Sequence, residues 1–183
     1  MNKFAYILLG VIMLLLASAS CKNNTYAEKR KAEQKLWQEY KSNNNLEIST
    51  DSAYCFNRPC PWPENLYFQT YRGAYVRLIE DDTTQIKAQE GHLVIFRFST
   101  YDLYGNLNSE NHDNSINREG FYFVYTPGSE DASISIAFTD AVGCIHHGTK
   151  FEVIVDSKLG VKTQQEAVVT TRIVVDETTI RNQ

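Results

Sequence analysis

The sequence has 183 residues and a formal net charge of −4, and 43% of its residues are hydrophobic and 22% charged. This length accommodates one domain with an additional N-terminal segment, and the composition is that of a folded globular protein. The acidic balance, without a basic stripe interleaved with aromatic residues, argues against broad electrostatic binding to nucleic acid.

Residues 1–20 are predicted to be an export signal. Lys3 supplies a positive charge, residues 4–16 are almost entirely apolar, and small residues precede Cys21. The segment resembles the lipobox of bacterial lipoproteins, although Ser18 stands where a larger aliphatic residue is usual. The resemblance implies that a lipid on Cys21 anchors the protein in the cell envelope, at the periplasmic or surface face of the outer membrane. The alternative is ordinary cleavage, which would release a soluble protein.

Residues 21–45 are predicted to contain a helix. Asn24 or Thr25 provides the N-cap, and Lys, Arg, Glu and Gln cover most of the surface. The apolar face is narrow and consists of Ala32, Leu36, Trp37 and Tyr40. We interpret this helix as a solvated spacer that holds the domain off the membrane. A partner-binding amphipathic helix is the alternative, which the narrow apolar face disfavours.

Residues 46–73 are predicted to link the spacer to the main domain. The linker contains three prolines within five residues, which excludes a regular element there. Because the export signal implies an oxidising compartment, Cys55 and Cys60 could form a disulfide and leave Cys144 unpaired. Cys144 is interpreted as a small buried hydrophobic residue rather than a nucleophile.

Residues 74–183 are predicted to form the main domain. Abundant Tyr, Phe, Val, Ile and Thr favour a sheet. Two polar stretches without periodicity, 104–120 and 160–166, indicate loops. Alternating apolar residues predict strands in residues 46–50, 74–80, 91–102, 121–125, 151–155 and 167–175, with a further candidate at 134–136.

One short helix is predicted inside this domain, immediately before the strand at 151–155. Phe138, Ala141, Val142 and Ile145 have the spacing of one apolar stripe on a helix. Gly148 stands where a C-capping glycine belongs.

The charged and nucleophilic residues do not form a recognisable catalytic set. His146 and His147 are predicted to end the helix, where an imidazolium favours the negative end of the dipole, and adjacent helical residues point too far apart to chelate one metal. Asp81 and Asp82 are interpreted as solvated loop carboxylates. No G-x-S-x-G, H-E-x-x-H or G-x-G-x-x-G motif occurs. We therefore expect no metal and no cofactor, and we assign no catalytic residue.

Two stretches resemble the FKBP-type peptidyl-prolyl isomerase fold. Residues 91–100 are similar to that family's G-D-x-V-x-V-H-Y-T-G strand, with Phe98 in the place of one pocket tyrosine. Residues 138–160 match its pattern of a tryptophan-led helix, a glycine and a strand, with Phe138 at the tryptophan position. The resemblance implies an α+β fold, in which an antiparallel sheet wraps around one short helix after the N-terminal helical spacer.

The layout also resembles an uncharacterised family of small bacterial envelope lipoproteins with an FKBP-like domain, including an S-K-L-G turn. The resemblance implies a pocket lined by Phe98, Phe121, Phe123, Phe138 and Leu159. In the isomerases a tyrosine at the position of Leu159 donates a hydrogen bond to the substrate carbonyl, so its loss implies weak catalysis. Plain core packing is the alternative for the phenylalanines.

We therefore expect a membrane-anchored domain that binds a protein or peptide, with weak or vestigial isomerase activity at most and no nucleic-acid partner. Two alternatives stay open. The first is a peptidyl-prolyl isomerase or chaperone of the envelope. The second is a structural or adhesive surface lipoprotein that uses the loop at 104–120.

Overall fold

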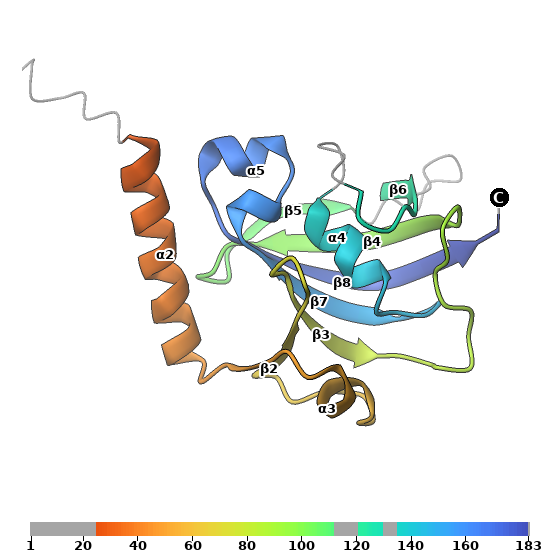
Figure 1. Cartoon of the computed structure of the whole chain (residues 1–183). Helices are drawn as coiled ribbons and strands as arrows, with labels where there is room; N and C mark the ends of the chain where they lie inside the picture. Colours follow the sequence, from red (N-terminus) through yellow and green to blue (C-terminus); the bar gives the residue numbers. More distant parts are fainter. Residues whose placement is uncertain (1–24, 112–120, 130–134, 183) are drawn as a thin grey trace, which may run out of the picture.

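The computed structural model describes residues 25–111, 121–129 and 135–182 (Figure 1). Its strands form one eight-stranded sheet in the order β1-β2-β3-β7-β8-β4-β5, and β6 pairs with the first part of β4. Neighbouring strands are antiparallel except β1 and β2, which run parallel. The strands are β1 (Glu47–Ser49), β2 (Leu66–Gln69), β3 (Tyr75–Glu80), β4 (Leu93–Tyr101), β5 (Leu107–Asn111), β6 (Phe121–Val124), β7 (Lys150–Val155) and β8 (Thr171–Arg181).

The long strand β8 lies between β7 and β4 at the centre of the sheet. The sequence predicts a last strand ending at Val175, whereas β8 continues to Arg181. The register with β4 shifts between Arg97 and Phe98, which marks a bulge that bends the pair. Asp176 and Glu177 are exposed at this bulge and interrupt the apolar alternation. The sequence pattern therefore does not indicate the second half of the strand.

Helix α4 (Ile136–Val142) packs against one face of the sheet and fills the core (Figure 1). The predicted apolar stripe is confirmed for Phe138, Ala141 and Val142, which are buried on the helix. Ile145 is also buried but lies beyond the end of the helix. The helix begins earlier than predicted because the side chain of Ser135 accepts a hydrogen bond from the N–H of Ala137. In the candidate strand at 134–136, residue 135 is instead this N-cap and residue 136 begins the helix, while residue 134 lies outside the described residues. The predicted α+β class, with an antiparallel sheet around one short helix, is confirmed.

The C-terminal end of α4 differs from the prediction. The helix ends at Gly143, not at Gly148, which has a φ of +84° in the turn that leads into β7. His146 and His147 therefore lie beyond the helix and cannot interact with its dipole as expected. The Nδ1 atom of His147 instead accepts a hydrogen bond from the N–H of Ile180 at 3.0 Å.

Helix α2 (Tyr26–Asn43) has the predicted N-cap. The Thr25 side chain accepts a hydrogen bond from the N–H of Glu28, and the Glu28 carboxylate accepts one from the N–H of Thr25. This capping box satisfies two backbone donors that the first turn leaves free. None of the helices in the described part of the chain has the length and apolar character of a membrane span.

One side of α2 is packed against the domain rather than solvated (Figure 1). Arg30 and Glu33 are 9% and 5% exposed, and the Trp37 ring lies 4.9 Å from that of Tyr75. The interpretation of α2 as a solvated spacer is therefore wrong for this side. The sequence pattern misleads because Arg30 and Glu33 bind partners that lie far away in the sequence.

Three short helices complete the described structure. They are α3 (Ser52–Phe56), the 3-10 turn η1 (Ser157–Leu159) and α5 (Lys162–Ala167). Helix α5 occupies the stretch predicted as a polar loop. It ends at Val168, which has a φ of +57°, so the chain reverses before β8 begins.

Candidate functional site

Phenylalanines from three elements form one cluster at the start of α4. Side chains two residues apart on a strand face the same side, so β4 contributes Phe98 and β6 contributes Phe121 and Phe123 to the face that α4 covers. The ring centroids of Phe98 and Phe121 lie 5.5 and 5.7 Å from that of Phe138, in tilted arrangements that aromatic rings favour. The structure therefore brings the four predicted phenylalanines together.

The cluster has a buried floor and a partly exposed wall. Phe123 and Phe138 are 5% and 4% exposed, whereas Phe98 and Phe121 are only half-buried and pack on the edge of the core. The half-buried rings form an apolar surface of the kind that accepts a ligand's apolar group.

Leu159 lies at the same end of the core, in the turn formed by η1. Its carbonyl accepts a hydrogen bond from the Ser135 hydroxyl at 2.8 Å, which ties the turn to the N-cap of α4. The Leu159 side chain is half-buried and packs against the core cluster. It supplies apolar surface and no hydrogen-bond donor.

A charged cluster beside this site is not apparent from the sequence. The Asp140 carboxylate of α4 accepts hydrogen bonds from the Arg72 Nε atom at 2.6 Å and from the Thr70 hydroxyl at 2.7 Å. Arg72 also donates to the carbonyl of Ser129 at 3.1 Å. Arg72 and Thr70 belong to the turn between β2 and β3, so this turn is fixed against α4. The sequence signal that could indicate this contact is Asp140, an acidic residue within a mostly apolar helix.

Solved structures with the same arrangement of sheet and helix include a DUF4827 family protein from Parabacteroides distasonis. The TM-score is 0.59, with 19% identity over 86% of this chain and 98% of that one. A peptidyl-prolyl cis-trans isomerase from Pseudomonas syringae gives 0.51 and 12% over 88% of this chain and 97% of that one. FkpA from Escherichia coli gives 0.52 and 13% over 100% of this chain and 74% of that one. The chain has an FKBP-like fold.

These structural similarities, at 12 to 19% identity, establish the fold of the domain and not its activity. No family model matches the sequence, and neither does any curated protein. The function of the aromatic cluster in this FKBP-like domain therefore has to be inferred from the geometry of the cluster.

A hollow of about 860 Å³ opens beside the C-terminal end of α4, and its lining includes Cys60 and Cys144. Burial raises the pKa of Cys144 to about 11, which keeps the thiol protonated at neutral pH. Burial also raises the pKa of Cys60. Neither thiol has the lowered pKa of a catalytic nucleophile. Cys144, predicted to be buried, is half-buried.

Asp81 lies in this hollow and is not the solvated carboxylate that the sequence suggests. Its side chain is 7% exposed, interacts with the Nδ1 atom of His146 at 2.9 Å and accepts a hydrogen bond from Thr149. Asp82, in contrast, is exposed as expected, and the hydroxyl of Thr84 holds its pKa below the usual range. No group of three or more metal-ligating side chains occurs among the residues described here.

The remaining predicted residues lie elsewhere or outside the described ranges. Cys21 and residues 112–120 of the predicted adhesive loop fall outside them. Cys55 is buried in the core and Cys60 is half-buried, and both are free thiols in this structure. A Cys55–Cys60 disulfide in an oxidising compartment stays a prediction.

Proposed function

We propose that this protein is a lipoprotein of the cell envelope whose FKBP-like domain binds a protein or peptide and has weak or no isomerase activity. The supporting observation is the partly exposed aromatic surface at the start of α4, where Phe98, Phe121 and Phe138 contact one another. Leu159 packs on the same core without a hydroxyl group.

The chemistry of this surface separates binding from catalysis. Half-buried aromatic rings favour an apolar group such as a prolyl ring through burial of its surface. Isomerisation also requires stabilisation of the twisted amide, to which a hydrogen bond at the carbonyl contributes. A hydrogen bond of about 1.4 kcal/mol in the transition state corresponds to about tenfold in rate. Leu159 cannot donate that bond.

An envelope isomerase or chaperone is the second candidate function. It is favoured by the similarity of nearly the whole fold to the Pseudomonas syringae isomerase, which spans 88% of this chain. Under this alternative a different donor replaces the tyrosine, or desolvation alone accelerates the reaction.

An assay of proline isomerisation and peptide binding tests the proposal. The protein is the chain from Lys22 onward, because α2 is packed on the domain and must be retained. We expect saturable binding of a proline-containing peptide with at most a few-fold acceleration of its isomerisation. Strong acceleration would establish the second candidate, and a folded domain that binds no such peptide would overturn the proposal.

A pair of variants places the binding at the aromatic surface. Phe98→Ala removes a half-buried ring of that surface, whereas Tyr122→Ala removes a ring that is 59% exposed on the neighbouring strand. We expect peptide binding to weaken at least fivefold in the first variant and to stay unchanged in the second, with circular dichroism confirming that both fold.

The anchoring part of the proposal is supported by the sequence before α2 and has its own test. A cell expressing the full chain with a clickable palmitate analogue should label the protein and retain it in the membrane fraction. Cys21→Ser should abolish the label. Labelling that persists in this variant would overturn lipidation at Cys21.

A further inference from the structure

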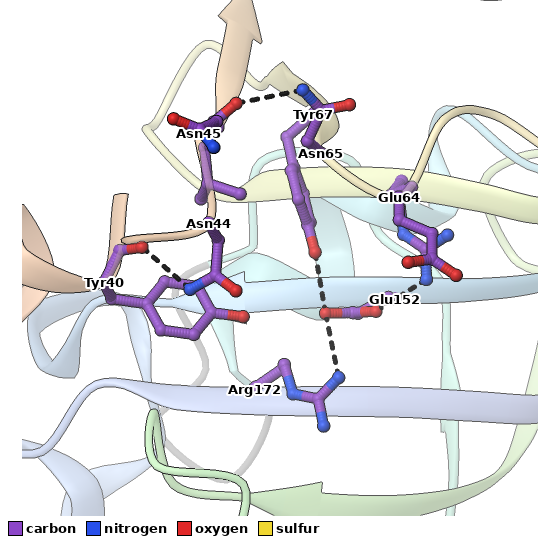
Figure 2. Close-up of a pocket in the computed structure, with 10 residues that line it drawn as sticks. Tyr40, Asn44, Asn45, Glu64, Asn65, Tyr67, Glu152 and Arg172 are labelled. Carbon is purple, nitrogen blue, oxygen red and sulfur yellow. Dashed lines mark hydrogen bonds and ion pairs between the residues drawn. The ribbon is translucent and has the colours of Figure 1, made fainter. Parts of the chain in front are cut away.

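A polar pocket of about 580 Å³ lies on the face of the sheet opposite α4 (Figure 2). Successive side chains of β7 alternate between the two faces, so Val153 packs in the α4 core while Glu152 faces the other way. The end of α2, the segment before β2 and the four strands β2, β3, β7 and β8 supply the walls. The lining residues are Tyr40, Asn44, Asn45, Leu46, Glu64, Asn65, Tyr67, Arg77, Glu152 and Arg172.

Glu152 lies at the base of this pocket, and both of its carboxylate oxygens accept hydrogen bonds. Its side chain is 3% exposed and accepts hydrogen bonds from the Tyr67 hydroxyl at 2.8 Å and from Arg77 Nη2 at 2.9 Å. Arg172 Nη1 lies farther away, at 3.4 Å. Figure 2 shows the chain of contacts from Tyr67 through Glu152 to Arg172. Two guanidinium groups therefore share one carboxylate.

Several donors in the pocket are left over after these contacts. The Nε atom of Arg77 is buried and has no hydrogen-bond partner within the described residues. Among the described residues, the hydrogen-bond acceptor of Arg172 is Glu152, at the long distance of 3.4 Å, and its guanidinium lies 4.8 Å from the centre of the Tyr101 ring. Burial and the charge of Glu152 raise the pKa of Tyr40, so its hydroxyl stays a donor at neutral pH. The buried Nε atom of Arg77 is not accessible to a ligand, so the donors available to an incoming acceptor are the Tyr40 hydroxyl and the Arg172 guanidinium, which both line the pocket.

The charge of the pocket limits which acceptor fits. The interior has one positive charge in excess, because two guanidinium groups face one carboxylate. Glu64 is exposed at the rim, where water and salt screen it. A single carboxylate matches this excess and the forked geometry of a guanidinium, whereas a dianionic phosphate would meet the repulsion of Glu152.

We propose that this pocket binds a small molecule or chain end that presents one carboxylate, with Arg172 as the principal contact. The volume suits a ligand of dipeptide size. Asn44 and Asn65 donate their amide N–H groups to the chain itself, so their carbonyl oxygens can accept from an amine or hydroxyl on the ligand. In Figure 2 Asn65 lies on the side of Glu152 opposite Arg172, and Asn44 lies beside Tyr40. The site does not depend on the proposed function of the aromatic surface.

Calorimetric titration of the full chain in a mild detergent tests this site with three probes. These are the dipeptide Ala-Ala, its C-terminal amide and its N-acetyl form. We expect saturable binding of Ala-Ala and at least tenfold weaker binding of the amide, which lacks the carboxylate. Undiminished binding of the N-acetyl form would identify a chain terminus as the ligand, and weaker binding a free amino acid or dipeptide. No saturable binding, or equal binding of the amide, would overturn the proposal.

Matched variants locate the binding. Arg172→Gln should weaken Ala-Ala binding at least tenfold, whereas Arg97→Gln, which removes an arginine paired with Glu177 on the same sheet, should leave it unchanged. Tyr40→Phe removes only a hydroxyl and should weaken binding about threefold while preserving the fold. Equal loss in the Arg97 and Arg172 variants would overturn the assignment.

Discussion

The carboxylate of Glu33 in α2 receives both hydrogen bonds that Ser157 can donate, although the two residues are 124 positions apart. The Ser157 N–H lies 3.0 Å from Oε1, and its hydroxyl lies 2.9 Å from Oε2. Thr170 adds a third bond to Oε1 at 2.8 Å, and Arg30 pairs with both Glu33 and Asp156. The N-terminal helix is thus fastened to the turn that contains Leu159.

Replacing Glu33 with Ala should destabilise the protein by about 3 kcal/mol, because it removes the acceptor of the Ser157 N–H and of two hydroxyl groups. It also leaves the buried guanidinium of Arg30 with Asp156 as its one remaining carboxylate partner among the described residues. Urea-induced unfolding measures this loss. The control is Glu39→Ala in the same helix, which breaks an exposed ion pair with Lys35 and should cost less than about 0.5 kcal/mol. Similar losses in the two variants would contradict the fastening described above.

Leu159→Tyr should increase the rate of proline isomerisation about tenfold, by supplying one hydrogen-bond donor next to the aromatic surface. The control is Leu159→Phe, which adds the ring without the hydroxyl and should leave the rate unchanged. The protease-coupled or NMR exchange rate of a cis-prolyl peptide is the measurement. Equal gains in both variants would show that ring size, not hydrogen bonding, limits this site.

The sequence predicts the aromatic site better than its surroundings. Alternation along β4 and β6 places Phe98, Phe121 and Phe123 on one face, and helical spacing places Phe138 opposite them. These are local periodicities, which a sequence displays directly. The contact of Arg72 with Asp140 joins a turn to a helix, and no local pattern encodes it.

The same difference between local patterns and long-range contacts explains why only part of α2 is predictable. The capping residues Thr25 and Glu28 are three positions apart, so the start of the helix is predictable. Arg30 and Glu33 have the appearance of solvated helix residues, because their partners Asp156 and Ser157 lie more than a hundred positions away. Helix α5 is short and polar, and its hydrophobic pattern is too weak to distinguish it from a loop.

Alkaline pH should weaken the fold through Tyr67. Burial and the charge of Glu152 raise the pKa of Tyr67 above the ordinary value for tyrosine. The stabilisation of the neutral phenol is complete below about pH 10, the ordinary pKa, and falls by about 1.4 kcal/mol per pH unit above it. Urea unfolding of wild type and Tyr67→Phe should therefore show a stability difference at pH 8 that shrinks at pH 11. The exposed Tyr104→Phe should show no such change.

Cys144 should resist alkylation in the folded protein. With a pKa of about 11, its thiolate fraction at pH 8 is about two orders of magnitude below that of an ordinary thiol. A Cys55→Ser, Cys60→Ser variant isolates this thiol, and mass spectrometry follows its reaction with iodoacetamide in buffer and in urea. Rates in buffer that approach those in urea would show that Cys144 is not held in an environment that raises its pKa.

The fastening of α2 by Arg30 and Glu33 also sets how far the domain could reach from a bilayer. Only residues 22–25 separate Cys21 from the start of this helix, and the chain from Cys21 to Tyr26 extends at most about 17 Å. A lipid on Cys21 would therefore hold the domain close to the bilayer through a short connecting segment. Such a protein would meet partners that lie on or near the membrane surface, and it would sample little of the aqueous space beyond.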